Sequence, residues 1–406
     1  MLAEKEIILG VSGSIAAYKS VEILRGLRRL GAGVTVVMTA NALEFISPLT
    51  FQTLSGQKTI TTLFDPTGEF RPEHIALSQR GDLLLVAPAT ANVIGKFAGG
   101  IADDSLSTLF LSMQAPVLIA PAMNPVMYAN PFVQRNLRLL EEKGIDSIEP
   151  ATGEVACGES GQGRLAPAEE IIDRVVQRLG GKSPLRKRKV IVTAGPTREY
   201  IDPVRYISNA SSGKMGFALA KAAYRRGAEV ILISGPNSLP RPGGIEYIPV
   251  ISTQEMMQAL ERSFPSSSVT IMIAAVCDFK PVHQESHKIK KSGLSEYSLA
   301  LEKTPDILKH LGQIKDEQIL VGFAAETEDA FANALTKLQE KNLDLICCND
   351  ITRPGAGFDA DTNIVTLIDA QQRTVHLPLM SKDKVAEKIL DKVEALLREK
   401  QCSFDR

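Results

Sequence analysis

Short runs of β-branched and other apolar residues alternate with amphipathic segments along the whole chain. In the first half the apolar runs lie at residues 7–11, 34–38, 83–87 and 117–120. A helical pattern over residues 14–30 follows the first run, and Gly31 ends it. Strands that alternate with helices are typical of β-α-β units around a mostly parallel sheet. The first half therefore predicts an open α/β domain.

The same alternation starts again in the second half. Its apolar runs lie at residues 190–193, 230–234, 269–276, 319–323 and 345–348. Residues 363–368 and 374–377 then predict a closing antiparallel pair, and residues 381–400 predict a long charged helix on the outside. A second open α/β domain is therefore expected, with a mostly parallel sheet of its own.

Composition marks the boundary between the halves. Residues 180–189 are rich in Gly, Pro and basic side chains, as interdomain linkers often are. A length of 406 residues also fits two or three domains of about 150 residues each. We therefore expect one domain over residues 1–180, a linker over 181–189 and a second domain over 190–406.

Composition and charge also exclude several classes of function. The chain is 44% hydrophobic and 23% charged with a formal net charge of -1, so it has no basic field to attract nucleic acid. Its five cysteines show no C-x-x-C spacing, which argues against a disulfide framework and a structural zinc site. There is no leader pattern and no apolar run near the ~20 residues of a spanning helix. We expect a cytoplasmic protein without nucleic-acid or membrane partners.

Small and polar residues follow each strand that is expected in the first half. They lie at residues 12–14, Thr39, 88–90 and 121–124. Ligands of open α/β sheets bind beyond the carboxyl ends of the strands, where helix N-termini offer free N–H groups to phosphate. The first turn is neither G-x-G-x-x-G nor a P-loop, and an ordinary strand-to-helix turn explains it about as often. These strand ends predict one pocket and leave its ligand open.

Four ordered strings in the first half resemble the flavin-containing cysteine decarboxylases, specifically phosphopantothenoylcysteine decarboxylase. The strings are GSIAAYK, HIALSQRGDLLLVAPATAN, PAMNPVM and ACGESGQGR. The resemblance implies a flavodoxin-like, Rossmann-like domain with FMN at its strand ends. The flavin contacts that it implies are Gly13, Ser14, Ile15, Thr39, Ala89 and Ser107, and the catalytic residues are His74, Asn124 and Cys157.

Each of the three catalytic candidates also has a purely structural interpretation. His74 could cap or pack near a helix start, and Asn124 could be a turn or N-cap residue. Cys157 could be a small buried hydrophobe, as most free cysteines are. The glycine-rich segment 158–163 favours a flexible polar flap over a core segment at that place.

The implied reaction explains why these residue types are needed. The flavin oxidises the thiol carbon of the substrate to a thioaldehyde, which accepts the electrons left when carbon dioxide departs. His74 would be the base of this oxidation, and Asn124 would orient the carboxylate. Reduced flavin then returns hydride to the enethiol, and Cys157 would supply the proton.

Five strings in the second half resemble phosphopantothenate-cysteine ligase, whose bacterial fused form uses CTP. They are VTAGPTREYIDPVRYISNASSGKMG, AAVCDFKP, KIKK, KTPDIL and VGFAAET. Attack of the phosphopantothenate carboxylate on the α-phosphate of CTP gives an acyl-cytidylate and pyrophosphate. Lysines, and Mg²⁺ held by the triphosphate, would balance the charge. A dinucleotide-binding turn is the alternative, but the helix starts about twenty residues after the strand, too far for that turn.

The resemblance also implies roles for particular residues of the second half. Lys288 is the implied catalytic lysine, and Asn209 is implied to contact the acyl-cytidylate or to help cysteine consume it. Residues 195–197 and 211–216 are expected to offer backbone N–H groups to phosphate or acyl oxygens. The implied CTP contacts are Met272, Ile273, Ala274, Asp278, Lys288, Thr304, Pro305, Asp306, Ile307, Phe323, Lys337 and Lys341.

Two other functions compete with this interpretation. A two-domain NAD(P)-dependent oxidoreductase is disfavoured by the missing G-x-G-x-x-G. A flavin-binding regulatory subunit is disfavoured because His74, Asn124 and Cys157 occur together. The resemblance further implies a homo-oligomer, a dodecamer with trimers of the flavin domain and dimers of the ligase domain. The expected partners are the small-molecule substrates phosphopantothenate, cysteine and CTP.

Overall fold

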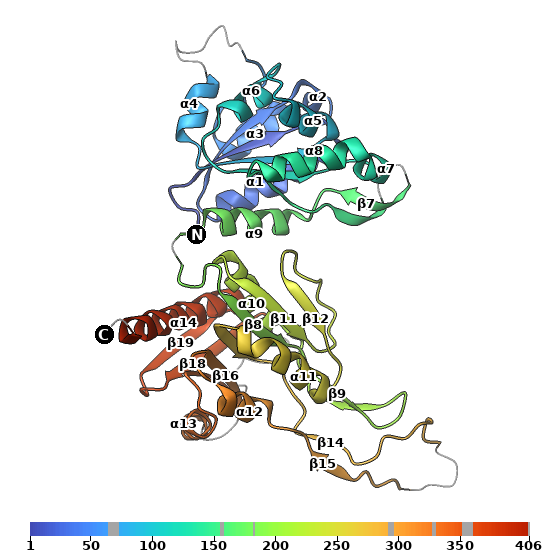
Figure 1. The fold of residues 1–406 in the computed structure, drawn as a ribbon, viewed down its shortest axis with the longest axis vertical. Helices are drawn as coiled ribbons and strands as arrows, with labels where there is room; N and C mark the ends of the chain where they lie inside the picture. Colours follow the sequence, from blue (N-terminus) through green and yellow to red (C-terminus); the bar gives the residue numbers. More distant parts are fainter. Residues whose placement is uncertain are drawn as a thin grey trace. The chain divides into compact units, whose positions relative to one another are not determined.

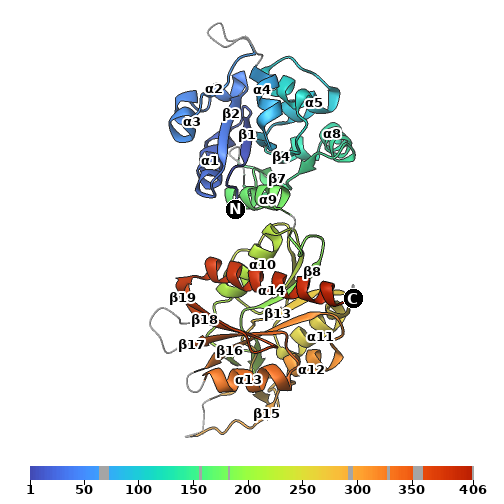
Figure 2. The same cartoon turned by 90° about the vertical axis from the view of Figure 1, so that its left-hand side faces the viewer.

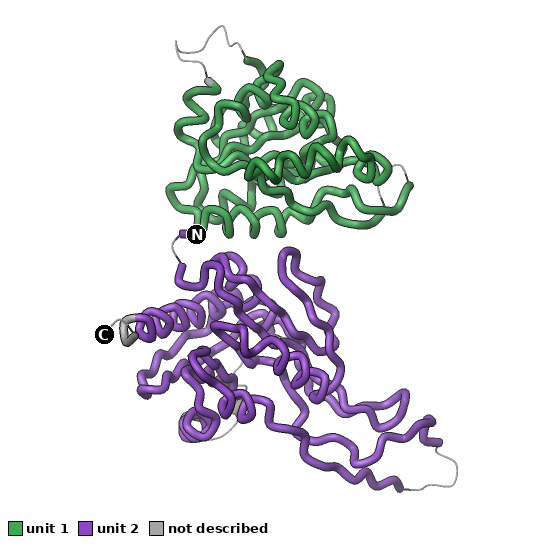
Figure 3. The backbone as a smooth tube through the Cα atoms, in the orientation of Figure 1, with its two compact units in different colours: residues 1–180 green, residues 181–406 purple. Residues whose placement is uncertain are grey.

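The chain folds into two compact units. The computed structural model describes residues 1–63, 73–154, 158–181, 183–290, 296–326, 330–350 and 360–404. The units are Met1–Gly180 and Gly181–Arg406, drawn in green and purple in Figure 3. Each is an α/β sheet with helices on both faces, as Figure 1 shows. In the described ranges, no helix combines the length and the apolar character needed to cross a bilayer.

The first unit contains the parallel sheet that its sequence predicts. The strand order is β2-β1-β3-β4-β5, and every neighbouring pair is parallel. The strands of this sheet are β1 (Glu6–Val11), β2 (Gly33–Met38), β3 (Leu83–Ala89), β4 (Val117–Pro121) and β5 (Asp146–Ser147). The helices are η1 (Ile15–Tyr18), α1 (Lys19–Arg29), α2 (Ala40–Leu43), α3 (Pro48–Ser55), α4 (Glu73–Arg80), α5 (Ala91–Gly99), α6 (Ser105–Ser112), α7 (Pro125–Ala129), α8 (Pro131–Glu142) and α9 (Ala168–Leu179).

Both faces of this sheet are buried, which explains why its strands are continuous apolar runs. Leu9 packs with α1, α3 and α9 on one face, whereas Ile8 packs with α4, α5, α6 and α8 on the other. The expected helix over 14–30 begins as the short turn η1, which the hydroxyl of Ser14 caps by accepting from Ala16 N at 3.2 Å. The sequence did not predict the antiparallel hairpin of β6 (Ala151–Glu154) and β7 (Ser160–Arg164).

The second unit contains an eight-stranded, mostly parallel sheet in the order β12-β11-β8-β13-β16-β17-β18-β19. The last two strands run antiparallel, as predicted. The strands are β8 (Lys189–Ala194), β11 (Glu229–Ser234), β12 (Glu246–Pro249), β13 (Val269–Met272), β16 (Ile319–Glu326), β17 (Leu345–Asp350), β18 (Thr362–Asp369) and β19 (Thr374–Ser381). Two small pairs lie outside it: β9 (Arg198–Tyr200) with β10 (Tyr206–Ser208), and β14 (Phe279–Pro281) with β15 (Leu301–Lys303).

Helices cover the two faces of this second sheet (Figure 2). One face packs against α10 (Lys214–Arg225) and α14 (Lys382–Phe404), through residues such as Leu219 and Ile389. The other face packs against α11 (Thr253–Ser263), with η2 (Phe264–Ser266) after it, and against α12 (Ile307–Ile314) and α13 (Ala330–Glu340).

Two boundaries in the second unit differ from those expected. The strand expected over 269–276 ends at Met272, because the following residues leave the sheet as a loop. Leu185 is fully buried in the core of the second unit, although the sequence predicts a linker over 181–189. The later part of that segment therefore packs as part of the second unit.

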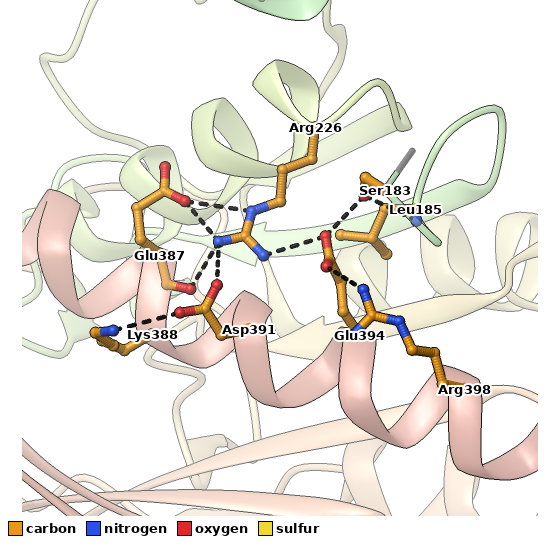
Figure 4. Close-up of polar contacts among 8 residues, drawn as sticks. All are labelled: Ser183, Leu185, Arg226, Glu387, Lys388, Asp391, Glu394 and Arg398. Carbon is orange, nitrogen blue, oxygen red and sulfur yellow. Dashed lines mark hydrogen bonds and ion pairs between the residues drawn. The ribbon is translucent and has the colours of Figure 1, made fainter. Parts of the chain in front are cut away.

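Arg226, directly after α10, ties this helix to α14 (Figure 4). Its guanidinium lies 2.6 Å from Glu387 Oε2, 2.7 Å from Asp391 Oδ1 and 3.2 Å from Glu394 Oε1. These carboxylates share one face of α14 because they are spaced three and four residues apart. Glu394 also accepts a hydrogen bond from Ser183 Oγ at 2.7 Å. Ser183, close to the first residue of the second unit, therefore belongs to the same cluster.

We predict that Arg226→Ala lowers the free energy of unfolding by about 2 kcal/mol, because it leaves neighbouring carboxylates without their shared cation. Urea unfolding followed by circular dichroism measures the change. Arg398→Ala is the matched control, since its side chain is 60% exposed and lies 3.4 Å from Glu394. That variant should lose less than about 0.5 kcal/mol. An equal loss of unfolding free energy in the two variants would contradict the claim that Arg226 is the shared cation of this cluster.

Candidate functional site

A cavity of about 400 Å³ lies at the carboxyl ends of the strands in the first unit. Gly13 and Ser14 border it after β1, and Thr39 borders it after β2. Residues 90–93 follow β3 and residues 122–123 follow β4. Residues from α2, α5 and α7, and Asp104 at the N-cap of α6, complete the wall. Four strand ends therefore meet at one pocket, which confirms the expectation from the parallel sheet.

The groups at this cavity fit an anionic ligand. Thr39 Oγ1 is buried and has no hydrogen-bond partner among the residues that the structure describes. Thr39 and Thr90 precede α2 and α5, but neither side chain caps its helix. This unsatisfied hydroxyl borders the same cavity as the N-terminus of α5, and the two together could bind the phosphate of a flavin mononucleotide.

Lys96 also borders this cavity, but carboxylates already balance its charge. Its ammonium lies 2.6 Å from Asp103 Oδ1 and 2.7 Å from Asp104 Oδ2. Burial disfavours the ammonium, yet the hydrogen bonds that it donates to both carboxylates outweigh burial and raise the pKa of Lys96. An anion in this cavity would therefore be bound mainly by N–H and hydroxyl donors, because the charge of Lys96 is already compensated.

The expected flavin residues do not all border this cavity. Ile15 borders an adjoining cavity instead, which shares Ser14 with the first. Ala89 is fully buried, and its carbonyl accepts from Ala122 N at 3.0 Å. Ser107 is buried in a capping box with Asp104, one turn behind the wall. Thr90 lines the cavity as its strand-end position predicts, whereas Asn41, Asn92, Lys96 and Asp104 were missed because they lie on helices or at a cap.

The adjoining cavity, of about 410 Å³, contains Asn124 in its wall. Asn124 is the N-cap of α7, and its Oδ1 accepts from Val126 N at 2.8 Å and Met127 N at 3.1 Å. Its Nδ2 donates to the carboxylate of Glu159. The capping role considered from the sequence is thus real, and it leaves the amide nitrogen facing a carboxylate.

The expected glycine-rich flap is part of the β6–β7 hairpin, which packs on the Asn124 loop. Met123 N donates to Gly163 O at 2.9 Å. A Cβ at Gly163 would lie 2.4 Å from Met123 O, and φ there is +157°, so only glycine allows this close approach. Cys157 falls between the two strands and lies outside the described residues.

His74 does not share a cavity with Asn124 in the described part of the chain. It is half-buried on α4 and lines a separate small hollow with residues such as Ile60, Leu77 and Ser105. The structure therefore brings Asn124 close to the expected flavin contacts Ser14 and Ile15, and it does not bring His74 there.

A larger cavity, of about 670 Å³, opens at the carboxyl ends of the strands in the second unit. Asn209 borders it, as do the starts of α10 and α12. Every expected nucleotide contact except Lys288 lines it: Met272, Ile273, Ala274, Asp278, Thr304, Pro305, Asp306, Ile307, Phe323, Lys337 and Lys341. These residues come from segments far apart in the sequence.

Charge in this cavity is partly balanced within the protein. Lys341 Nζ lies 2.9 Å from Asp306 Oδ2, and Asp306 Oδ1 caps α12 by accepting from Lys309 N at 3.0 Å. Burial alone would raise the pKa of Asp306, but the hydrogen bonds from Lys341 and Lys309 outweigh it and lower the pKa. Asp306 is therefore ionised at neutral pH and holds Lys341 at the cavity wall.

Several backbone N–H groups near this cavity are already bonded within the protein. Thr197 N donates to Ala275 O at 3.3 Å, so residues 195–197 offer fewer donors to phosphate than expected. The N–H groups of Ile273 and Ala274 both donate to Thr193 Oγ1 at 3.0 Å. The expected anion site over 211–216 lines the cavity, and α10 begins there after Gly213, whose φ is +78°.

Lys288 lies on the arm that β14 and β15 form, which Figure 1 shows extending from the sheet. Its side chain is exposed and does not line the cavity. The next residue is held in place, since Ile289 N donates to Asp202 Oδ2 and Ile289 O accepts from Arg205 Nη2, both at 3.2 Å. Among the described residues, the structure therefore does not bring Lys288 together with the other expected nucleotide contacts.

The cavity also contains polar residues that the sequence interpretation missed. Asn349 follows the strand expected over 345–348, so the strand-end rule applied to the second half would have found it. Asn363 and Lys382 gave no such signal, because the expected elements did not show that β18 and α14 reach this pocket. Within the described ranges, no three His, Cys, Asp or Glu side chains gather as a metal site.

Comparison with known proteins relates both units to characterised families. Residues 1–180 match the family described as "Flavoprotein", and residues 185–397 match "DNA/pantothenate metabolism flavoprotein C-terminal domain". The coenzyme A biosynthesis bifunctional protein CoaBC of Bacillus subtilis (strain 168) is 48% identical over 98% of this chain and 99% of its own length. The protein of the same name from Escherichia coli (strain K12) is 43% identical over 98% and 99%.

Among solved structures, the C-terminal domain of a coenzyme A biosynthesis bifunctional protein CoaBC is 41% identical. The match covers 53% of the present chain and 98% of the chain in the solved structure, with a TM-score of 0.46. The full-length identity and the two matched families lead to one assignment: the chain belongs to the CoaBC family of bifunctional coenzyme A biosynthesis proteins.

Proposed function

We propose that the chain makes 4'-phosphopantetheine in two steps, one in each unit. The second unit joins phosphopantothenate to cysteine at the expense of CTP, and the first unit decarboxylates the product. The observation that carries this proposal is the cavity of the second unit, which gathers the expected nucleotide residues from separate strands and helices. Membership of a family named for two activities in coenzyme A synthesis supports the pairing, and it disfavours an NAD(P)-dependent oxidoreductase or a regulatory subunit.

In the proposed ligation the cavity binds CTP and the carboxylate of phosphopantothenate together. Attack of the carboxylate on the α-phosphate breaks the bond to pyrophosphate and forms the acyl-cytidylate. Lys337 and Lys341 line the cavity and can stabilise the negative charge that develops on the phosphates. Asn209 and Lys288 would act on the acyl-cytidylate and on its formation. Mg²⁺ would be held by the triphosphate rather than by a cluster of protein ligands.

In the proposed decarboxylation FMN supplies the oxidising and reducing capacity that turns the substrate thiol into an electron sink. Thr39 and the start of α5 would hold its phosphate. The Nδ2 of Asn124 already donates to a carboxylate, that of Glu159, and could orient the carboxylate of the substrate in the same way. His74 would remove a proton, and Cys157 would return one to the product.

The purified chain should be yellow and should convert phosphopantothenate, cysteine and CTP into 4'-phosphopantetheine, carbon dioxide, CMP and pyrophosphate. Mass spectrometry of the product and release of pyrophosphate measure the two steps separately. Formation of phosphopantothenoylcysteine without decarboxylation would reject the proposal for the first unit only. The cytoplasmic location and the dodecameric assembly stay predictions.

We predict that Lys288→Ala slows acyl-cytidylate formation by about a hundredfold or more, because a counter-charge at phosphorus is lost. Pyrophosphate release measures this step. Lys290→Ala is the matched control, since Lys290 is also exposed on the arm. Decarboxylation of added phosphopantothenoylcysteine should be normal in both variants. An unchanged rate of pyrophosphate release would make Lys288 an ordinary surface charge.

We predict that Cys157→Ser stops after a single turnover of the decarboxylase, because a hydroxyl is a much weaker proton donor than a thiol at neutral pH. One equivalent of carbon dioxide and an unsaturated thiol should form, without 4'-phosphopantetheine. Quenched-flow sampling with mass spectrometry measures both products. A variant that releases no carbon dioxide would place Cys157 in an earlier step, and normal turnover would remove it from the mechanism.

A further inference from the structure

A chain of hydrogen bonds runs from Glu199 to the loop after β13. Glu199 Oε1 accepts from Thr253 N at 2.8 Å and from Thr253 Oγ1 at 2.7 Å. Thr253 Oγ1 lies 3.2 Å from Thr197 Oγ1, which accepts from Cys277 N at 2.9 Å. Exposed fractions are 0% for Thr197, 1% for Thr253, 4% for Cys277 and 6% for Glu199, so water does not compete for these bonds.

The carboxylate at one end fixes the direction of the chain. Thr253 gives its hydroxyl hydrogen to Glu199, so toward Thr197 its oxygen can only accept. Thr197 must therefore donate to Thr253, and its own oxygen accepts the N–H of Cys277. Each donor points toward Glu199 Oε1, and no hydroxyl in the chain can reverse without losing a bond.

The peptide between Val276 and Cys277 connects this chain to Asn209. The N–H and C=O of a trans peptide point in opposite directions, and this peptide is trans. Since the Cys277 N–H is held by Thr197, the Val276 carbonyl faces the other way, where it accepts from Asn209 Nδ2 at 3.0 Å. Ala275 O accepts from the same nitrogen at 3.1 Å, and it also accepts from Thr197 N at 3.3 Å.

These contacts set the orientation of the Asn209 carboxamide. Both hydrogens of Nδ2 are donated to backbone carbonyls, which leaves Oδ1 as the polar atom of the side chain that can accept from a ligand. Asn209 borders the large cavity of the second unit. The buried Thr197 positions both carbonyls that hold Asn209. It donates its N–H to Ala275 O, and its hydroxyl fixes the peptide that carries Val276 O.

We infer that Thr197 is a positioning residue of the ligase site: together with Thr253 and Glu199 it fixes the 276–277 peptide, which in turn orients Asn209 toward the acyl-cytidylate. This inference rests on the proposed function of the second unit. It assigns Thr197 a role in orienting Asn209 and no contact with the substrate.

Thr197→Val keeps the shape of the side chain and removes the hydroxyl. Consumption of the acyl-cytidylate by cysteine should slow by about ten- to hundredfold, since a small misplacement of a reacting group has effects of that size. The KM for CTP should change by less than about twofold, because CTP binds before Asn209 acts. Thr197→Ser should restore most of the rate, as it keeps the oxygen.

A double-mutant cycle separates positioning from general damage. If Thr197 acts through Asn209, Asn209→Ala and the double variant Thr197→Val/Asn209→Ala should have the same rate within about twofold. Additive losses, or a Thr197→Ser variant as slow as Thr197→Val, would overturn the inference. Thr270→Val is the matched control, because Thr270 is also fully buried and bonds through its hydroxyl at 3.1 Å, but to Ser267. The decarboxylase rate reports the amount of active chain in each sample.

Hydrogen exchange tests the same contact without any activity. The Cys277 amide should exchange about tenfold faster in Thr197→Val than in the unaltered chain, while amides of β8 keep their protection. Unchanged exchange at Cys277 would overturn the inference even if the ligase were inactive. If the unaltered chain forms no acyl-cytidylate, while Thr197→Val still shows the faster exchange, the proposed function of the second unit is rejected and the contact is established.

Discussion

Parallel strands cannot be joined by tight turns, so each must return across a face of the sheet, usually as a helix. This constraint governs both units. It buries both faces of each sheet, as the packing of Leu9 and Ile8 on opposite sides of β1 illustrates. It also places the loops that leave the strands at one edge, and the cavities of both units open at that edge.

Loops at such an edge have lost the hydrogen bonds of the sheet and need others. After β13 ends at Met272, three threonines supply them. Thr193 accepts the N–H groups of Ile273 and Ala274, Thr197 accepts that of Cys277, and Thr304 donates to the Cys277 carbonyl at 2.5 Å. Side-chain hydroxyl groups therefore fix the backbone of this loop at the cavity wall, where the hydrogen bonds of the sheet have ended.

In both units, a lysine at the cavity wall is paired with carboxylates of the protein. Lys96 is paired with Asp103 and Asp104, and Lys341 is paired with Asp306. Such pairs keep a cavity without ligand from exposing isolated charges to a partly desolvated space, which would be costly. In the proposed function, a phosphate would compete for these lysines, and a neutral donor such as Thr39, whose buried hydroxyl has no partner among the described residues, would help to position it.

The sequence by itself determined the elements and their class, because periodicity, capping and turn residues act between near neighbours. It predicted the parallel strands, the antiparallel end of the second sheet and, through the resemblance, most residues of the large cavity. It did not predict the early end of β13, the β6–β7 hairpin, the separate hollow of His74 or the presence of Lys382 in the cavity. Those features depend on strand order and on contacts between distant residues, such as Thr197 and Cys277, which are 80 positions apart. Only tertiary packing decides which strand ends meet, because a local sequence pattern contains no information about the partner across the sheet.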